Sequence, residues 1–285
     1  MLHESVPSSA AEASVPALFF DRKRLSEQAK GLSESYRNAD PFPHIVVDNF
    51  LPPQVLERVL EEFPNVSSGV WEKYNDRLQQ KQGSRDEASL GPSTRTLLRE
   101  FNGSAFLSFL EELTGITGLI PDPWFEGGGL HQIEPGGLLK VHVDFNKHTL
   151  TRLDRRVNAL LYLNKDWEES WAGQLELWDQ DMQRAAHKIL PLFNRLVVFN
   201  TTDFANHGHP EPLACPPGKT RKSIALYYYS NGRPAHELKS SAHTTMFRRR
   251  PGERIPWTLS EIGENLLPPI VTEIVRKKGF FKGRR

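Results

Sequence analysis

The feature that most constrains the fold is a succession of short apolar segments after Pro121, each closed by turn-forming residues. Runs of about four to eight residues rich in Val, Ile, Leu and aromatic side chains, bounded by Gly, Pro, Asn or Asp, are typical of β-strands. Because no helical periodicity interrupts these runs, we expect a β-sandwich or a jelly roll. The expected strands cover residues 130–133, 138–145, 157–163, 175–178, 188–191, 195–200 and 222–229.

The part of the chain before Pro121 has a different character. Apolar residues recur there at helical spacing, and one β-branched run predicts a single strand. Residues 65–93 are polar and are expected to be irregular. By analogy with other folds alone, Trp71, Tyr74 and the residues around them are a candidate lid over the functional site. The expected helices cover residues 19–36, 54–63 and 94–115, and the expected strand covers 42–50.

These changes of character divide the chain into four parts. The first is a flexible tail with an N-terminal helix, and the second is a helical support region with the first strand and the candidate lid. A β-structured core follows, and a basic extension ends the chain. The expected boundaries are 1–38, 39–124, 125–235 and 236–285.

Composition narrows the classes of function. The 285 residues carry a formal net charge of +1, so no global field favours nucleic acid as a partner. A single cysteine, Cys215, excludes an internal disulfide framework and a thiolate zinc site. We find neither an apolar run of roughly 18 residues, as a membrane span needs, nor a secretion signal. A cytoplasmic location is therefore expected, and the oligomeric state stays open.

Two residues of the expected strand 138–145 can bind a metal ion together. His142 and Asp144 are two positions apart, and alternation within a strand puts both side chains on one face. A second histidine would complete the two-histidine, one-carboxylate triad that holds non-haem Fe(II) in oxygenases. Because a His-x-Asp pair often arises by chance, its meaning depends on the segments that follow it.

The segments that follow resemble the core of the 2-oxoglutarate/Fe(II) prolyl hydroxylases. Residues 156–167 include Tyr-Leu-Asn-Lys-Asp-Trp, which is closely similar to a run in the hypoxia-sensing prolyl hydroxylases. Residues 173–178, 191–199 and 221–228 resemble later strands of that family, in the same order. The resemblance covers roughly residues 125–232. It implies a mainly β fold with flanking helices, a double-stranded β-helix of the jelly-roll, cupin-like type.

By this resemblance, His142 and Asp144 fall on the family's metal-binding His-x-Asp. The distal ligand is His207 or His209, which lie close together in the run Asn-His-Gly-His-Pro. The interval from Phe193 to His207 matches the family's interval between strand and ligand, which favours His207. His209, in what we expect to be a loop, would then face away or lie behind the ligands.

The resemblance also implies an anchor for the carboxylate of 2-oxoglutarate that lies far from the metal. Arg221 opens the last core strand, where the family has Arg or Lys, and a guanidinium can bind a carboxylate through two parallel hydrogen bonds. Lys219 and Lys222 are alternatives, and the insert at 211–220 is longer than in the hypoxia-type enzymes. Tyr162 falls on a family tyrosine that hydrogen-bonds the same carboxylate; otherwise it is a core aromatic.

Together these features predict an Fe(II)/2-oxoglutarate-dependent dioxygenase that uses O2, hydroxylates an unactivated C–H bond and releases succinate and CO2. Ascorbate is a further candidate cofactor. The expected substrate is a prolyl residue of a protein or peptide; a small molecule is the alternative, and a non-catalytic jelly-roll binding protein is the third. Arg152 and Arg156, with Arg155, are expected on a loop that either binds an anionic substrate group or is simply solvated.

Overall fold

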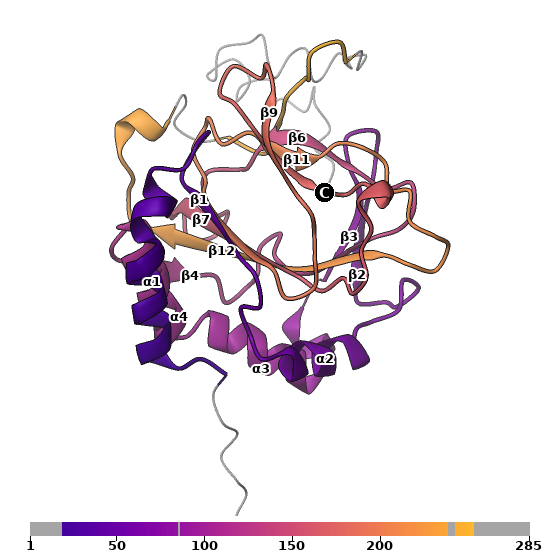
Figure 1. Ribbon diagram of the computed structural model, residues 1–285, viewed down its shortest axis with the longest axis horizontal. Helices are drawn as coiled ribbons and strands as arrows, with labels where there is room; N and C mark the ends of the chain where they lie inside the picture. The colour runs from indigo at the N-terminus through magenta and orange to yellow at the C-terminus, as the bar shows by residue number, and fades with distance from the viewer. Residues whose placement is uncertain (1–18, 85, 239–242, 254–285) are drawn as a thin grey trace, which may run out of the picture. The chain divides into compact units, whose positions relative to one another are not determined.

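The computed structural model describes residues 19–84, 86–238 and 243–253. Residues up to Arg248 belong to one compact unit, which is built mainly from antiparallel β-sheet (Figure 1). The mainly β prediction is therefore confirmed. Among the described residues, no helix combines the length and the apolar character that crossing a bilayer requires.

The larger sheet has the strand order β1-β10-β7-β12-β5-β3-β2, and β4 pairs with β12. Its central strands β7 and β12 are buried almost throughout, which explains why their sequences are apolar runs without strict alternation. Its strands are β1 (His44–Val47), β2 (Trp71–Asn75), β3 (Gln80–Ser84), β4 (Ile120–Pro121), β5 (Gly129–Ile133), β7 (Asp154–Tyr162), β10 (Leu196–Asn200) and β12 (Arg221–Ser230).

The smaller sheet has the order β13-β6-β11-β8-β9. Strand β6 lies between β11 and β13, so a segment close to residue 248 completes a sheet whose other strands come from the middle of the chain. The strands are β6 (Leu139–Val143), β8 (Leu175–Trp178), β9 (Ala185–Ile189), β11 (His207–His209) and β13 (Met246–Phe247).

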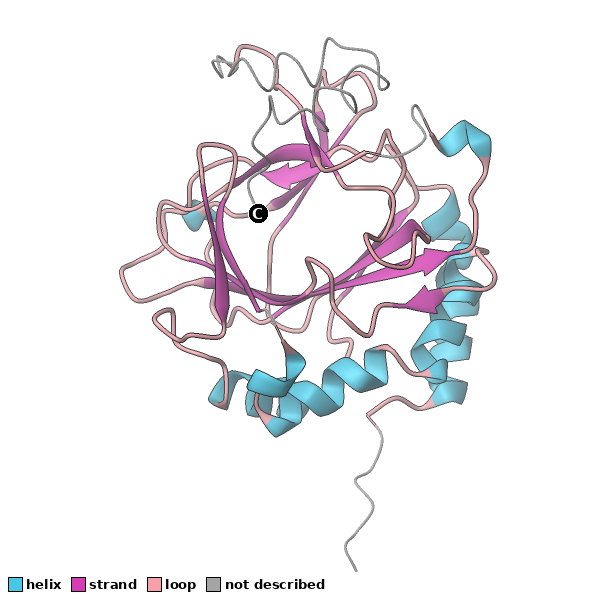
Figure 2. Ribbon diagram, turned by 180° about the vertical axis from the view of Figure 1, so that it is seen from behind, coloured by secondary structure: helices cyan, strands magenta, loops and turns pink. Residues whose placement is uncertain are grey.

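Four α-helices lie together along one side of the larger sheet (Figure 2). Their apolar faces and the outer face of that sheet form one continuous core, in which Phe106 contacts the rings of Phe20, Phe101 and Tyr228. Burying each such ring contributes roughly 2–3 kcal/mol to stability. The helices are α1 (Arg22–Arg37), α2 (Pro53–Glu61), α3 (Pro92–Phe101) and α4 (Ser104–Thr114).

A second, smaller apolar cluster joins the inner faces of the two sheets. It includes Tyr162, Leu177 and Phe199, which come from β7, β8 and β10. The larger sheet therefore packs against helices on one face and against the smaller sheet on the other. Buried polar side chains, among them His142 and Arg221, lie outside this apolar cluster.

The structure corrects several expected elements. The helix expected over 94–115 is two helices, because the chain turns at Asn102 and Gly103. Strands β2 and β3 form a hairpin in the region expected to be irregular; their side chains are mostly polar, so hydrophobic patterning did not reveal them. Strand β7 begins at Asp154, so Arg155 and Arg156 lie in a strand and not in a loop.

Candidate active site

Strands β6 and β11 bring together the three residues expected to bind metal. His142 lies on β6, Asp144 follows directly after it, and His207 on β11 pairs opposite His142. Nε2 of His142 lies 3.5 Å from Oδ1 of Asp144, and Nε2 of His207 lies 3.4 Å from Oδ2. The three potential ligand atoms all lie within 4.8 Å of one another. His209 is not part of this group.

The hydrogen bonds of the two histidines direct the same nitrogen of each toward Asp144. Nδ1 of His142 lies 2.9 Å from the carbonyl oxygen of Lys140, and Nδ1 of His207 lies 2.9 Å from that of Ala205. An Nδ1–H that donates to a carbonyl leaves the lone pair of Nε2 free for a metal. Metal–ligand distances of about 2 Å bring ligand atoms to about 3 Å from each other. The donor set therefore fits one divalent ion.

The charge state of the site also suits a cation. Burial alone would raise the pKa of Asp144, but Arg155, His207 and His142 hold that pKa well below its ordinary value. Burial lowers the pKa of His207 to about 4. The carboxylate is thus ionised and the His207 imidazole neutral near pH 7, which are the forms that bind metal.

Two residues of β7 hold one oxygen of Asp144. Nδ2 of Asn158 donates to Oδ2 at 2.8 Å, and Nη2 of Arg155 lies 3.1 Å from the same oxygen. Arg155 also donates to Oδ1 of Asn158 and lies over the rings of Phe145 and Tyr227. These contacts fix the orientation of the carboxylate. Both contacts with Asp144 involve its Oδ2, so neither Asn158 nor Arg155 occupies Oδ1. Sequence analysis gave Asn158 no role and placed Arg155 in a loop.

A buried cation lies elsewhere on the inner face of the larger sheet. Arg221 is 5% exposed; its Nε donates to the carbonyl oxygen of Gly173 at 2.8 Å, and its Nη2 donates to the hydroxyl of Tyr162 at 3.3 Å. No carboxylate of the described residues forms an ion pair with Arg221. Lys222 points the other way, with its Nζ 5.5 Å from the centre of the Phe63 ring, as alternation along β12 requires.

His209 differs from its expected placement. It lies in β11 and not in a loop, and it is 3% exposed. Neither ring nitrogen has a hydrogen-bond partner within the described part of the chain. Burial, reinforced by the positive charges of Arg221 and Lys81, lowers the pKa of His209 well below its ordinary value. Whether its side chain faces away from the metal or lies behind the ligands stays a prediction.

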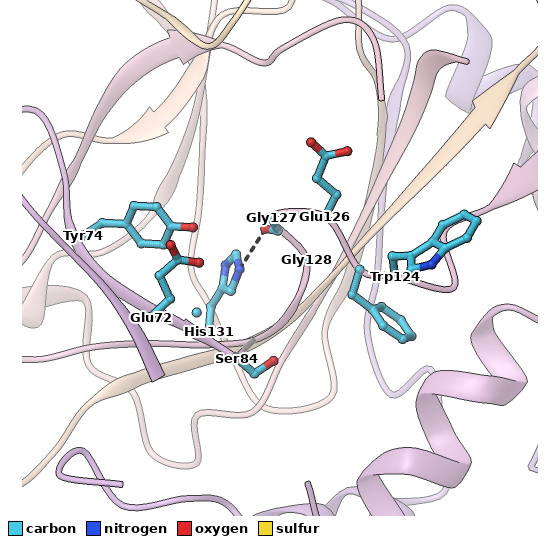
Figure 3. A pocket seen from close by; sticks show the side chains of 10 residues that line it. Glu72, Tyr74, Ser84, Trp124, Glu126, Gly127, Gly128 and His131 are labelled. Carbon is cyan, nitrogen blue, oxygen red and sulfur yellow. Dashed lines mark hydrogen bonds between the residues drawn. The ribbon is translucent and has the colours of Figure 1, made fainter. Parts of the chain in front are cut away.

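A cavity of about 290 Å³ lies beside the β2–β3 hairpin (Figure 3). Its lining includes Glu72 and Tyr74 from β2, Trp124, and His131 from β5. A hydrogen bond joins Nε2 of His131 to the carbonyl oxygen of Gly127, drawn as a dashed line. The hydroxyl of Tyr227 donates to the same carbonyl, and Tyr227 in turn contacts Arg155. The cavity is thereby linked to the residues that hold Asp144.

The two arginines considered for substrate binding have different surroundings. Arg156 is buried, and its Nη2 lies 3.1 Å from Oε1 of Glu237 while its Nη1 donates to the hydroxyl of Ser230. Arg152 is exposed, in a turn with a positive φ of 61°. The structure thus gives Arg156 internal partners, and the substrate role of Arg152 stays a prediction.

Comparison with known proteins yields one family. Residues 128–229 match the model of the 2OG-Fe(II) oxygenase superfamily. The chain is 28% identical over 200 residues to prolyl 3-hydroxylase OGFOD1 of Mus musculus, a match that covers 67% of this chain and 33% of that protein. It thus spans about a third of the length of this curated relative.

Solved structures agree on the fold. A prolyl hydroxylase from Trichoplax adhaerens, solved with a peptide fragment of the hypoxia inducible factor oxygen degradation domain, matches with a TM-score of 0.55 and 21% identity, over 73% of this chain and 92% of that one. A prolyl-4-hydroxylase of Pseudomonas putida matches with a TM-score of 0.51 and 19% identity, over 72% of this chain and all of the other. At these identities the comparison establishes the fold alone.

Residues 128–229 of the chain are thus similar to the 2-oxoglutarate/Fe(II) oxygenase superfamily. The region matched to the superfamily lies within the predicted core, and the jelly-roll prediction is confirmed. Fe(II) and 2-oxoglutarate are the cofactor and cosubstrate by which this superfamily is named, as predicted; ascorbate stays a prediction. Three features of this core, namely Asn158, the inward position of Arg155 and the buried His209, were not expected from sequence.

Proposed function

We propose that this protein is an Fe(II)/2-oxoglutarate-dependent dioxygenase that hydroxylates an unactivated C–H bond, with a prolyl residue of a protein or peptide as the substrate. One observation carries the proposal. A triad of two histidines and one aspartate shares the interior of the fold with Arg221, a buried cation that has no carboxylate partner among the described residues. A dicarboxylate that binds the metal at one end and Arg221 at the other would explain both the metal-binding triad and the buried arginine without a carboxylate partner.

Separate residues would bind the metal and the cosubstrate. Nε2 of His142, Nε2 of His207 and an oxygen of Asp144 would hold Fe(II), and Asn158 keeps the carboxylate turned toward it. Arg221 would bind the far carboxylate of 2-oxoglutarate. Tyr162 is 0% exposed and would bind the same group through its hydroxyl. A buried charge that is paired and hydrogen-bonded avoids the large cost of an isolated one.

When bound, Fe(II) and 2-oxoglutarate would supply the oxidation: 2-oxoglutarate, O2 and a substrate C–H give succinate, CO2 and a C–OH. The protein supplies orientation and a site shielded from water, since the histidine ligands are 4% and 6% exposed. The cavity beside the β2–β3 hairpin is where we propose that the substrate approaches, because its lining is linked through Tyr227 to Arg155 and Asp144.

The prolyl assignment is supported by the relative from Mus musculus, whose name states prolyl 3-hydroxylase, and by the peptide bound to the Trichoplax enzyme. The alternative, a small-molecule substrate, rested in part on a cluster of free arginines. Since Arg156 is buried and paired with Glu237, that support is reduced.

The test is succinate formation with Fe(II), 2-oxoglutarate and O2, screened against prolyl peptides and a panel of amino acids and sugars. We expect turnover with peptides, loss of turnover in His142→Ala and Asp144→Ala, and mainly a higher 2-oxoglutarate requirement in Arg221→Ala. Turnover restricted to small molecules would replace the prolyl assignment. Absence of both Fe(II) binding and turnover would support the non-catalytic alternative.

A further inference from the structure

His209 is a buried polar side chain without a bonding partner. It is 3% exposed, and both ring nitrogens are enclosed without a hydrogen bond in the described part of the chain. Buried polar groups are almost always hydrogen-bonded. We therefore expect a bound ligand to supply the hydrogen-bond partner that the His209 imidazole lacks. In every protonation state the ring carries at least one N–H donor.

The surroundings of His209 show where this partner would lie. Strand alternation places its side chain on the same face of β11 as His207, which belongs to the metal triad. His209 pairs with Leu139 on β6, the strand that carries the metal ligand His142. Besides burial, Arg221, Lys81 and His142 all contribute to the lowering of its pKa. His209 therefore borders the space in which we place 2-oxoglutarate.

The backbone of β11 holds His209 in that place. A Cβ on Gly208 would lie 2.9 Å from the carbonyl oxygens of Leu139 and Lys140. The backbones of β11 and β6 are therefore in close contact at this position. His209 pairs with Leu139 on that neighbouring strand. Its position is thus fixed by the same strand pairing that brings His207 to His142.

The guanidinium of Arg221 donates to Gly173 and Tyr162 but pairs with no described carboxylate. The ring of His209 has no hydrogen-bond acceptor at all among the described residues. We propose that His209 donates a hydrogen bond to the 2-oxoglutarate carboxylate that Arg221 binds, and so is a third positioning residue for the cosubstrate. This inference rests on the proposed function, and it gives the buried imidazole its missing acceptor.

The test measures binding and not turnover. Isothermal titration calorimetry follows 2-oxoglutarate and 2-oxopentanoate, in which a methyl group replaces the far carboxylate, as each binds to the full-length protein loaded with Ni(II). We expect His209→Leu to weaken 2-oxoglutarate binding about tenfold, as loss of a hydrogen bond to a charged group would. Binding of 2-oxopentanoate should not change. His209→Gln, which keeps an N–H donor, should recover most of the lost affinity.

Each other outcome overturns the inference. Wild-type affinity in His209→Leu would mean that the ring makes no bond to the cosubstrate, and an equal loss for both ligands would mean that it only packs the site. Loss of Ni(II) binding would make it part of the metal centre. His209→Met is a second apolar variant if Leu prevents folding. Failure of the wild-type protein to bind 2-oxoglutarate at all would instead overturn the proposed function.

Discussion

The carboxylate of Asp144 shows how much of this site depends on neighbours of the metal ligands. Its Oδ2 is held by Asn158 at 2.8 Å and by Arg155 at 3.1 Å, while the histidines approach from β6 and β11. Without these contacts the carboxylate could rotate about its Cβ–Cγ bond. Orientation by outer residues is commonly worth a factor of about 10–100 in metal affinity.

Replacing Asn158 by Ala should therefore weaken metal binding by about tenfold or more, because Asp144 loses a neutral donor that orients it. Titration of the metal-free protein with Ni(II) measures the change. Asn194→Ala is the matched control, since Asn194 is a buried asparagine that bonds the backbone of Leu51. It should lower stability without changing metal affinity. Equal metal affinities in both variants would contradict the orienting role.

We expect His131 to make the stability of the fold depend on pH. Its pKa is lowered by burial and by the charge of Lys81, from the ordinary 6.5 to about 3. The unfolded chain therefore takes up a proton below about pH 6.5 that the folded state does not. In the metal-free protein, stability should fall as pH decreases from about 7 to 5, and His131→Gln should reduce that slope. Urea unfolding across this range measures it; parallel curves for the two proteins would speak against the assignment.

At the scale of elements, irregularities of strand pairing place the polar residues. Along β7 the register shifts, so that Tyr228 pairs with Val157 while Tyr229 pairs with Arg155. The extra residue on β7 is a β-bulge, which changes the alternation and lets Arg155 and Asn158 meet on one face although they are three positions apart. On β11, Gly208 permits a close approach to β6.

Gly208→Ala should disturb the metal centre. The added methyl would lie 2.9 Å from two carbonyl oxygens of β6, so β11 would have to move away and carry His207 with it. We expect a loss of stability of about 1–3 kcal/mol together with weaker Ni(II) binding. Gly69→Ala is the control, because a Cβ there meets no atom within 4 Å. Unchanged Ni(II) affinity in Gly208→Ala would show that β11 tolerates the shift.

The same irregularities limit what the sequence can predict. His142 and Asp144 were predictable together because they are two positions apart in a recognisable strand, and His207 followed from the family interval. Arg155 and Asn158 were not, since a bulge is invisible in hydrophobic patterning. The β2–β3 hairpin has mostly polar side chains, and the three residues of β11 are too few to show a period. Their structure depends on the strands with which they pair.

At the scale of the whole unit, the two faces of the larger sheet have different roles: one packs against the helices and the other carries the polar residues of the site. Its outer face packs on the helices through a cluster of aromatic rings around Phe106, and its inner face carries Tyr162, Arg155 and Arg221. The outer core stabilises the sheet, and the inner face positions polar side chains. Most of the apolar burial is thus remote from the metal centre.

Phe106→Ala should lower the stability of the fold without changing the affinity of the site for 2-oxoglutarate. Phe106 is fully buried against Phe20, Phe101 and Tyr228, so its removal should cost about 3–5 kcal/mol of unfolding free energy. At a temperature where the variant is still folded, its affinity for 2-oxoglutarate should equal that of the wild type. Urea denaturation and calorimetry measure the two quantities. Leu150→Ala, at a residue that is 70% exposed, should change neither.

The strand that carries His142 has neighbours on both sides, since β11 and β13 both pair with it. Arg248 adds a backbone hydrogen bond to the carbonyl oxygen of Val141. A shortened chain that ends at residue 235, soon after the matched oxygenase region, would lose this cover and leave Val141–Val143 of β6 as an open edge. In the intact protein, amide protons on this strand should exchange slowly with deuterated solvent, and the shortened chain should lose that protection and tend to associate edge to edge.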